Sequence, residues 1–271
     1  MSERARGTKV RRALVAVASV AVVYGVLAEL GSRLLPRLAL IGFHEYDVEL
    51  FPPYASLAEE AVFLVRSGIL QGSIAVSTLR VLTGLALGGL VGIPLGLATA
   101  WAARFGSIME PWIVFFRFTP ALALLPLYVL WFGAGEVSRI LLIATGVAVV
   151  TLQGAVEGVR AVPRVYLDAA RSLGAPRRAV FRRIVMPAAL PHIAASVRIA
   201  TGLAWVTIVV AELVRPTMPS LGYLLALSGA YPRVQQIVLA LATIGALVLI
   251  SDTIALGLYH RATDWMRRRV A

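Results

Sequence analysis

The sequence predicts an all-α membrane protein with six transmembrane helices. Of its 271 residues, 59% are hydrophobic, and the mean hydropathy is +0.83; a soluble domain is usually about half apolar. The excess falls in continuous blocks of about twenty residues, the length that a helix needs to cross roughly 30 Å of hydrocarbon. Polar and apolar residues do not alternate within the blocks, which argues against strands.

The six predicted spans run from near the start of the chain to near its end. Arg and Lys residues precede the first span, as in a secretion signal, but no clear small-x-small cleavage site follows it. We therefore interpret it as an uncleaved span. The predicted spans are about 11–31, 78–101, 111–132, 139–159, 193–214 and 237–258, and the chain 1–271 is expected to form a single transmembrane domain.

The distribution of basic residues predicts the topology. The formal net charge is +12, and most of the 26 Lys and Arg residues lie in segments 1–12, 102–110, 160–192 and 259–271. Cytoplasmic loops are enriched in such residues, so both termini are expected in the cytoplasm. Because no basic stripe is interleaved with aromatic residues, membrane lipid is an expected partner and nucleic acid is not.

A short helix is predicted before the second span. Pro53 marks a turn, and Ser56 followed by Glu59 has the spacing of a capping box. The helix should extend to about Ser67 and end at Gly68. Its apolar positions, which suit an amphipathic helix against the membrane or the bundle, are Leu57, Ala61, Leu64 and Val65.

The second span carries a small residue at every fourth position. Such residues share one face of a helix and allow a second helix to approach closely. Packing within the subunit and a role in subunit contact or motion are both open, and Pro94 predicts a bend in this span. The small residues are Gly84, Gly88, Gly92, Gly96 and Ala100.

The third span contains Pro120 and Pro126, each of which removes a backbone hydrogen bond. Membranes tolerate such breaks where protein or a water-filled cavity satisfies the backbone. This span, with Thr119 beside Pro120, is therefore the best candidate to line a pathway, although a kink with only a packing role stays open.

Charged residues within the spans are few, and such residues usually face a cavity or a partner because lipid solvates them poorly. They are Arg80, Arg117, Arg198, Glu212 and Asp252. Arg80 and Arg117 lie near span ends, which also allows them to extend to the lipid headgroups. For Glu212, near the outer end of the fifth span, structural pairing and contact with a substrate are both open.

The long cytoplasmic segment 160–191, between spans four and five, is predicted to form a helix–turn–helix hairpin. Pro163 suits the first turn of a helix, and Gly174 suits the left-handed residue that ends one. Pro176 would begin a second helix, and Pro187 would end or kink it. The surface offered to a partner is Asp168, Ala169 and Ala170, and the residues expected to fix the hairpin to its bundle are Leu173, Phe181 and Ile184.

The residues needed for metal or nucleotide binding are absent. There is no cysteine, and His44, His192 and His260 are too far apart in sequence to form a ligand-spaced cluster. Lys9 is the only lysine, so a Gly-x-x-x-x-Gly-Lys phosphate loop is absent. We expect no enzyme activity, metal or cofactor in this chain; if it works with ATP, another chain must bind the nucleotide.

The cytoplasmic hairpin resembles the Glu-Ala-Ala motif of permeases from binding-protein-dependent ABC importers. The matching positions, with the family's spacing, are Asp168-Ala169-Ala170, Gly174, Ile184, Met186 and Pro187, with Asp for Glu and Met for Leu as the departures. Other stretches are similar to permeases of the nitrate/sulfonate/taurine group. They are Ser77-Thr78-Leu79-Arg80 with Gly84, residues 92–96, Pro120 to Leu127, Trp131-Phe132-Gly133, and Leu203-Ala204-Trp205 leading to Ala211-Glu212.

The resemblance implies the transmembrane subunit of an ATP-driven importer in the bacterial inner membrane. The implied partners are two ATP-binding subunits, which bind ATP and Mg²⁺, a second and identical permease subunit, and an extracytoplasmic solute-binding protein. The implied solute is a small anion such as nitrate, a sulfonate or taurine, an idea that Arg80, Arg117 and Arg198 support. The alternatives are a pyrimidine vitamin precursor in the same group and an ion-gradient-driven secondary transporter.

Two sets of candidate site residues follow. The resemblance assigns ATPase coupling to Asp168, Ala169, Ala170, Arg171, Leu173 and Gly174. The charges and helix breaks within the spans, together with the family-like stretches, nominate as pathway residues Arg80, Arg117, Thr119, Pro120, Trp205 and Glu212.

Overall fold

The computed structural model describes residues 22–23, 25–26, 52–230 and 233–267, and every regular element in these ranges is a helix. The helices are α2 (Tyr54–Arg66), α3 (Ile69–Trp101), α4 (Ala103–Phe118), the 3-10 turn η2 (Ala121–Leu124), α5 (Leu125–Phe132), α6 (Glu136–Arg160), α7 (Arg164–Ser172), α8 (Arg177–Val180), the π-helical segment η3 (Phe181–Val185), α9 (Met186–Val214), α10 (Leu221–Ala230) and α11 (Val234–Arg267). The all-α prediction is confirmed for the described part of the chain.

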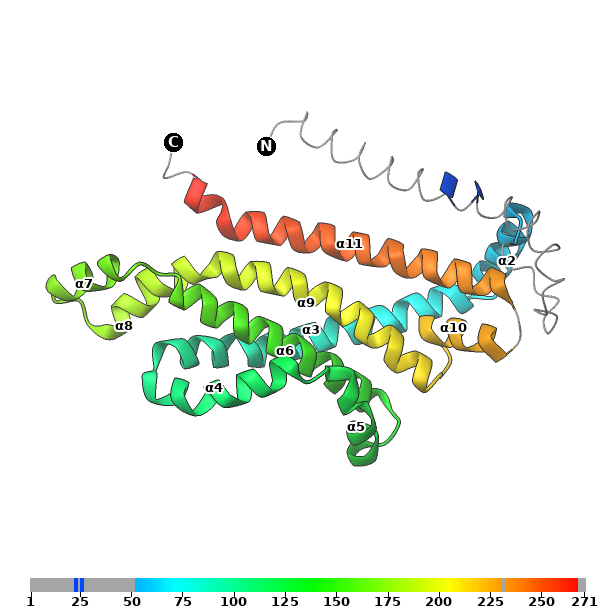
Figure 1. The fold of residues 1–271 in the computed structure, drawn as a ribbon. Coiled ribbons are helices and arrows are strands. Elements are labelled where there is room, and N and C mark those ends of the chain that lie inside the picture. Colours follow the sequence, from blue (N-terminus) through cyan, green and yellow to red (C-terminus); the bar gives the residue numbers. More distant parts are fainter. Residues whose placement is uncertain (1–21, 24, 27–51, 231–232, 268–271) are drawn as a thin grey trace.

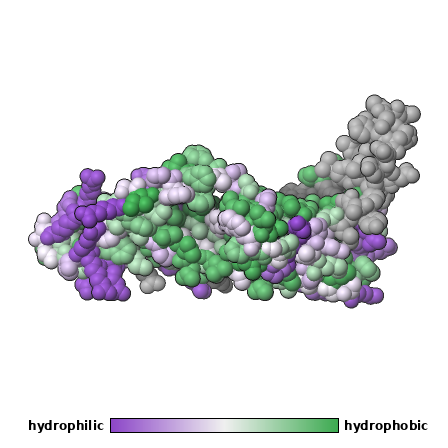
Figure 2. Space-filling view, turned by 90° about the horizontal axis from the view of Figure 1, so that it is seen from below, coloured by the Kyte–Doolittle hydropathy of each residue, from purple (hydrophilic) through white to green (hydrophobic). Residues whose placement is uncertain are grey.

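The long helices α3, α6, α9 and α11 run along the length of an elongated molecule (Figure 1). α6 lies between α3 and α9, and α11 packs on the other side of α9. The short helices α7 and α8 form a tip at one end, and α2 and α10 lie near the opposite end. Figure 2 shows hydrophilic side chains gathered over the α7–α8 tip and a largely apolar middle, as expected for a molecule embedded in lipid.

Four described helices are long and apolar enough to cross a membrane, and a bent pair makes a fifth if it is one span. The four are Ile69–Trp101, Glu136–Arg160, Arg177–Val214 and Val234–Asp264. The predicted first span, 11–31, lies almost entirely outside the described residues.

The predicted third span, 111–132, is interrupted at Pro120, where the sequence predicted a break. The helix begins earlier, at Ala103, and α4 and the η2–α5 unit meet at 95°. Thr119 is extended, with φ −82° and ψ 118°, because the Pro120 ring disfavours the helical conformation of the residue before it. Pro126 causes no break, since it occupies the first turn of α5, where a missing N–H is tolerated.

The segment before the second long helix differs from the capping-box prediction. α2 begins at Tyr54, and no side chain caps it; Ser56 Oγ instead donates to the Pro53 carbonyl over 2.9 Å. The predicted stop is confirmed, because Gly68 has φ +73° and separates α2 from α3. α3 then starts at Ile69, nine residues before the predicted span.

The stripe of small residues on α3 packs against α6. A Cβ added at Gly88 or Gly92 would lie less than 3.0 Å from atoms of α6, including the Ala144 and Ala148 carbonyl oxygens. Backbone-to-backbone approach of this kind gains dispersion contacts that lipid does not replace. Packing within the subunit is therefore the use of this stripe in the described structure.

Candidate functional site

The first predicted site is the tip formed by α7 and the turn that follows it. Gly174 has φ +72°, in the left-handed region that favours glycine. Its N–H donates to the Arg171 carbonyl over 2.9 Å, and the Ala175 N–H donates to the Ala170 carbonyl over 3.0 Å. These bonds satisfy carbonyls that the end of α7 leaves free, so the predicted left-handed end is confirmed.

α7 exposes a surface that includes apolar side chains. None of its residues is buried, and Asp168 and Ala169 are exposed. Leu173 was expected to anchor the hairpin, but this expectation is wrong, because its side chain is 87% exposed. Anchoring falls to other residues that pack against the inner end of the bundle, namely Leu167, Ala170 and Ala175.

We define the α7 surface as Val165, Tyr166, Asp168, Ala169 and Leu173, all of which are exposed. Arg171, also exposed, lies 3.5 Å from Asp168, one turn away, and both side chains are about two-thirds exposed. Such an exposed pair contributes little to stability. The acidic side chain therefore stays available to a basic group on a partner.

The second arm of the predicted hairpin is not a separate helix. α8, η3 and α9 form one helical run over Arg177–Val214. Pro187 neither ends it nor starts a loop, because it lies in the first turn of α9 after the π-helical segment. The predicted anchoring by Phe181 and Ile184 is confirmed, since both pack on the inner core.

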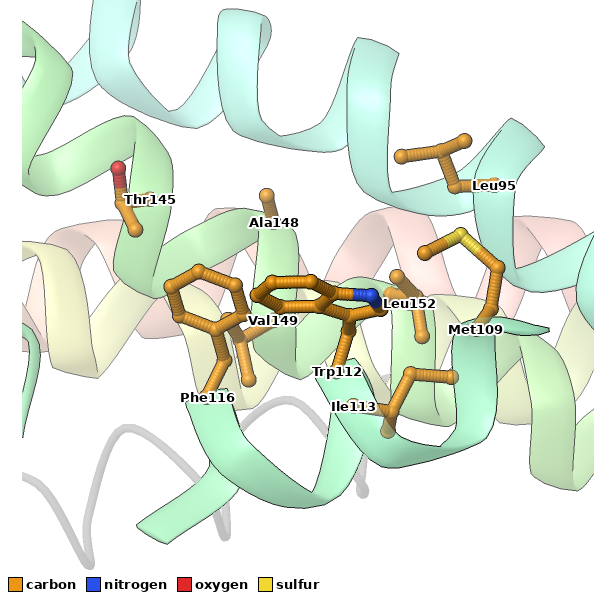
Figure 3. Close-up of a pocket in the computed structure, with 9 residues that line it drawn as sticks. All are labelled: Leu95, Met109, Trp112, Ile113, Phe116, Thr145, Ala148, Val149 and Leu152. Atoms are coloured by element: carbon orange, nitrogen blue, oxygen red, sulfur yellow. The ribbon is translucent and has the colours of Figure 1, made fainter. Parts of the chain in front are cut away.

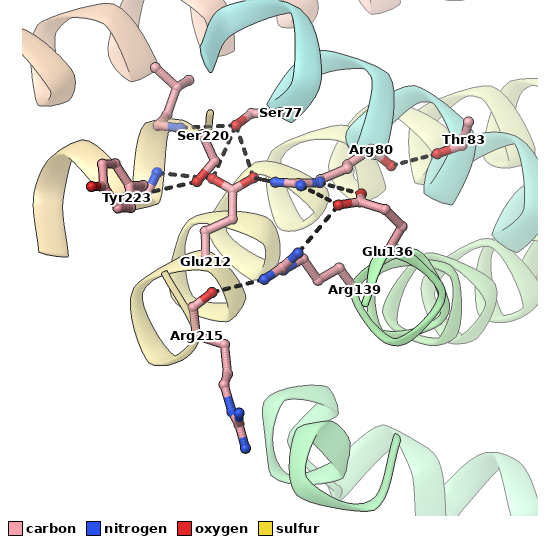
Figure 4. A network of polar contacts seen from close by, with 11 residues as sticks. Ser77, Arg80, Thr83, Glu136, Arg139, Glu212, Arg215, Ser220 and Tyr223 are labelled. Atoms are coloured by element: carbon pink, nitrogen blue, oxygen red, sulfur yellow. Dashed lines mark hydrogen bonds and ion pairs between the residues drawn. The ribbon is translucent and has the colours of Figure 1, made fainter. Parts of the chain in front are cut away.

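An ion network, buried except for the Glu136 side chain, lies at the other end of the bundle (Figure 4). Arg80 is 4% exposed; its Nη1 donates to Glu212 over 2.7 Å, and its Nε donates to Glu136 over 2.6 Å. Arg139 contacts Glu136 and donates to the Arg215 carbonyl over 2.8 Å. The headgroup interpretation is wrong for Arg80, because its charge is satisfied inside the bundle.

Glu212 also holds the start of α10. Its carboxylate is fully buried, accepts the Gly222 N–H over 2.9 Å and lies 2.9 and 3.0 Å from Ser77 Oγ. Ser77 Oγ in turn accepts the Leu221 N–H over 3.1 Å. A carboxylate at a helix N-terminus is stabilised by the free N–H groups there. Structural pairing, one of the two open interpretations of Glu212, is therefore the one observed.

Trp205 and Arg198 both lie on α9 and contact residues of α11. The Trp205 indole is 1% exposed and donates to Ser251 Oγ over 3.0 Å. Arg198 makes two bonds to Asp252, of 2.6 and 2.8 Å, across the α9–α11 contact. Both side chains of this pair are about two-fifths exposed.

Arg117, Thr119 and the α4–α5 bend border a cavity of about 240 Å³. Thr145 and Gln153 of α6 also line it, and sequence reasoning had missed both. An apolar cavity of about 330 Å³ adjoins it, with Phe116, Thr145 and Val149 in the walls of both. Figure 3 shows the ring of Trp112 and its neighbours on α4 facing α6 across this second cavity.

The structure thus divides the predicted pathway residues. It brings Arg117 and Thr119 to one polar cavity, with Pro120 at the bend beside it. Arg80 and Glu212 are bound to each other elsewhere, and Trp205 is buried. Among the described residues, no group of three or more His, Cys, Asp or Glu side chains is placed to hold a metal ion.

The model of the family described as "binding-protein-dependent transport system inner membrane component" matches residues 92–268, which include the tip and the cavity. The chain belongs to this family. It is thus an ABC transporter permease, a multi-pass component of the inner membrane.

Curated relatives align with most of this permease. It is 36% identical over 219 residues to a probable ABC transporter permease protein of Brucella abortus, covering 81% of this chain and 87% of the relative. It is 35% identical over 192 residues to the taurine transport system permease protein TauC of Escherichia coli, covering 71% and 70%. A third relative, at 29% identity and 76% and 72% coverage, is the bicarbonate transport system permease protein CmpB of Synechococcus elongatus.

Solved structures show the same fold in distant permeases. A chain of the MetNI methionine ABC transporter in an inward-facing conformation superposes with a TM-score of 0.62 at 17% identity, covering 72% of this permease and 96% of that chain. A chain of an amino acid ABC transporter matches with a TM-score of 0.62 at 16% identity, covering 74% and 97%. At these identities the likeness concerns the fold.

Proposed function

We propose that this permease forms, with a second copy of itself, the pathway of an ATP-driven importer. Two ATP-binding subunits dock on the α7 tips and hold the ATP and Mg²⁺, and a solute-binding protein delivers solute at the opposite face. Both termini lie in the cytoplasm, with six spans in all. Closure of the ATP-binding subunits moves the tips and switches the pathway between its two openings.

The α7 surface carries this proposal. It joins exposed apolar side chains, Val165, Tyr166 and Leu173, to an available carboxylate, Asp168. A protein surface with an apolar centre and a charged rim is typical of a partner contact. The tip also contacts the bundle: Leu167 of α7 packs on its inner core, and Arg177 of α8 donates to the Trp101 carbonyl over 2.8 Å at the end of α3. These contacts offer a route from α7 to the spans.

The proposed solute is a small anion. Relatives are named for taurine, aliphatic sulfonates and bicarbonate. The pairing of Glu212 with Arg80 and of Asp252 with Arg198 also disfavours an ion-gradient mechanism, because both carboxylates are engaged by arginines. A carboxylate that carries a coupling ion must be able to release its partner.

A bulky substitution on the α7 surface tests the docking. Ala169 is exposed, so Ala169→Trp leaves the permease's own packing intact, while the bulky side chain blocks close contact between α7 and the ATP-binding subunit. We expect the variant to reach the membrane normally and to lose co-purification with the ATP-binding subunits. Ser107→Trp, at an exposed position of α4, is the matched control and should retain them. Full retention by Ala169→Trp would refute docking at α7.

A further inference from the structure

Three arginines within the predicted spans, Arg80, Arg117 and Arg198, suggested an anionic solute, and the structure pairs two of them with carboxylates. Arg80 and Arg198 are held in the ion pairs described above. Arg117 makes no ion pair within the described part of the chain; its guanidinium carbon lies 6.0 Å from the centroid of the Phe118 ring. Arg117 lies in the last turn of α4, where the helix dipole favours a positive charge. The helix end provides no negatively charged side chain to pair with the guanidinium group.

The cavity beside Arg117 lies between α4 and the middle of α6. Thr145 and Gln153 are nine and seventeen residues into α6, which places them about 14 and 26 Å along a helix of 1.5 Å rise per residue. The full length of α6 is 25 residues, so both positions are away from its ends. An arginine exposed at this depth is costly in lipid and is expected to face water or a solute.

The polar lining is also incompletely paired. The Gln153 amide makes no hydrogen bond to any other described residue, so its two donors and its acceptor are open to the cavity. The volume of about 240 Å³ exceeds the roughly 10–15 Å³ that a single water needs, yet is below the ~300–1,000 Å³ of pockets for drug-sized ligands. The site therefore suits a small solute with an anionic head.

The adjoining cavity adds a second requirement. Its lining is almost entirely apolar, with Trp112, Phe116 and Val149 among the contributing side chains. A bare inorganic anion gains nothing from such walls, because it stays hydrated. An apolar chain attached to the anion gains about 0.8 kcal/mol for each CH₂ group that it buries.

We propose that the cavity at the α4–α5 bend is a solute site that selects a small organic anion with an apolar tail, such as an alkanesulfonate. The anionic head pairs with Arg117 and accepts a hydrogen bond from Gln153, and the tail packs against Phe116 and Val149. A single arginine guanidinium group can orient the anionic head through two parallel hydrogen bonds. Binding by one arginine stays reversible, as transport of the solute requires. This inference rests on the proposed transport function and adds the class of solute.

The absence of cysteine from the sequence allows a direct chemical test in membrane vesicles that hold the whole importer. Val149→Cys, which borders both cavities, is treated with sulfonatoethyl methanethiosulfonate (anionic) and with trimethylammonioethyl methanethiosulfonate (cationic). The ratio of anionic to cationic labelling rates should exceed that of Ser107→Cys by about tenfold, because the Arg117 charge attracts one reagent and repels the other.

Arg117→Gln in the Val149→Cys background should remove this preference. Arg104→Gln is the matched control, because it removes the same charge at the other end of α4, thirteen residues or about 20 Å along the helix from Arg117, and Arg104 lines neither cavity. It should leave the preference intact. An unreactive Val149→Cys, a ratio equal to that of Ser107→Cys, or a ratio unchanged by Arg117→Gln would overturn the site.

Competition then tests the solute class. Pentanesulfonate should slow the labelling of Val149→Cys at a concentration about tenfold lower than nitrate does, which corresponds to roughly two buried CH₂ groups. Equal protection by the two anions, or none by either, would overturn the selection for an organic anion. Labelling needs no ATP hydrolysis, so a negative labelling result would not count against docking at α7. A negative result of the Ala169→Trp experiment would likewise not count against the solute site.

Discussion

Arg80 and Glu212 are joined by an ion pair of 2.7 Å, although 132 residues separate them in the chain. The pair connects α3 to α9, and Gly222 and Ser77 complete the hydrogen bonding of the carboxylate. Removing one member of such a buried pair is costly, because the charge that remains is kept out of water without an opposite charge to compensate. The network therefore holds the ends of four helices in one arrangement.

Glu212→Gln tests this role. The amide keeps the shape but removes the negative charge, and Arg80 retains only Glu136. We expect a loss of about 3 kcal/mol in the free energy of unfolding, measured as a lower thermal midpoint of the purified permease in detergent. Glu110→Gln breaks an ion pair whose side chains are about three-fifths exposed, so it should cost less than ~1 kcal/mol. Equal midpoints for the two variants would contradict the interpretation.

Gly92→Ala tests the close contact of α3 with α6. The new methyl would overlap Thr151 and the Ala148 carbonyl, so the helices must separate, at a cost of roughly 1–3 kcal/mol. Gly89→Ala is the control on the same helix, because its Cβ would meet only the tip of Ile93, 3.9 Å away. It should be neutral or slightly stabilising. The measurement is the fraction of monodisperse protein after mild heating; a Gly89→Ala loss as large as that of Gly92→Ala would be unexpected.

Gly174→Val tests whether the α7 turn couples ATP hydrolysis to transport. A β-branched residue disfavours φ +72° by about 1–2 kcal/mol, and no atom lies within 4 Å of the added Cβ, so only the path of the turn changes. We expect loss of ATPase assembly, or ATP hydrolysis without uptake. Gly68→Val carries the same strain, at φ +73° and also in open space, but at the opposite end. Retained coupling in Gly174→Val, or its loss in Gly68→Val, would argue against a specific role.

Asp252→Leu should leave Arg198 without its partner in a helix that crosses the membrane. Arginine at such a position costs about 2.5–3.5 kcal/mol on insertion, so the yield of folded permease should fall. Arg198→Leu combined with Asp252→Leu removes both charges and should recover most of the yield, since an ion pair that is out of water is often replaceable by apolar residues. If the double variant were poorer than Asp252→Leu alone, the pair would have a role beyond mutual neutralisation.

Local chemistry explains which predictions were confirmed. Gly68 and Gly174 were expected to end helices because the residue after a helix often has a left-handed backbone conformation, which favours glycine over residues with a side chain. This preference acts within one helical turn. The break at Pro120 was visible for the same reason, but its angle was not: proline removes one hydrogen bond, and the 95° direction is set by what α5 packs against.

Predictions that required distant partners were incomplete. Glu136 and Arg139 carried no signal, since polar residues near predicted span ends are ordinary at a membrane surface. Ser77 was noted only as part of a family-like stretch, and the sequence did not show what the side chain of Gln153 faces. The headgroup interpretation of Arg80 and the anchoring of Leu173 failed because each depended on which way one helix face turns within the packed bundle. The row of small residues at every fourth position of α3 predicted a close contact with another helix. It did not predict that this helix would be α6.

The sequence by itself determined the class of the protein, the order of its helices and the motif at its tip, because hydropathy, proline and glycine act over a few residues through the backbone and its solvent. Only the tertiary structure decided which charges are satisfied. Arg80 and Arg198 meet carboxylates from helices far along the chain, whereas Arg117 meets a cavity. The rotation of each packed helix, rather than the residue type, makes the difference between a structural arginine and one that is free to hold an anion.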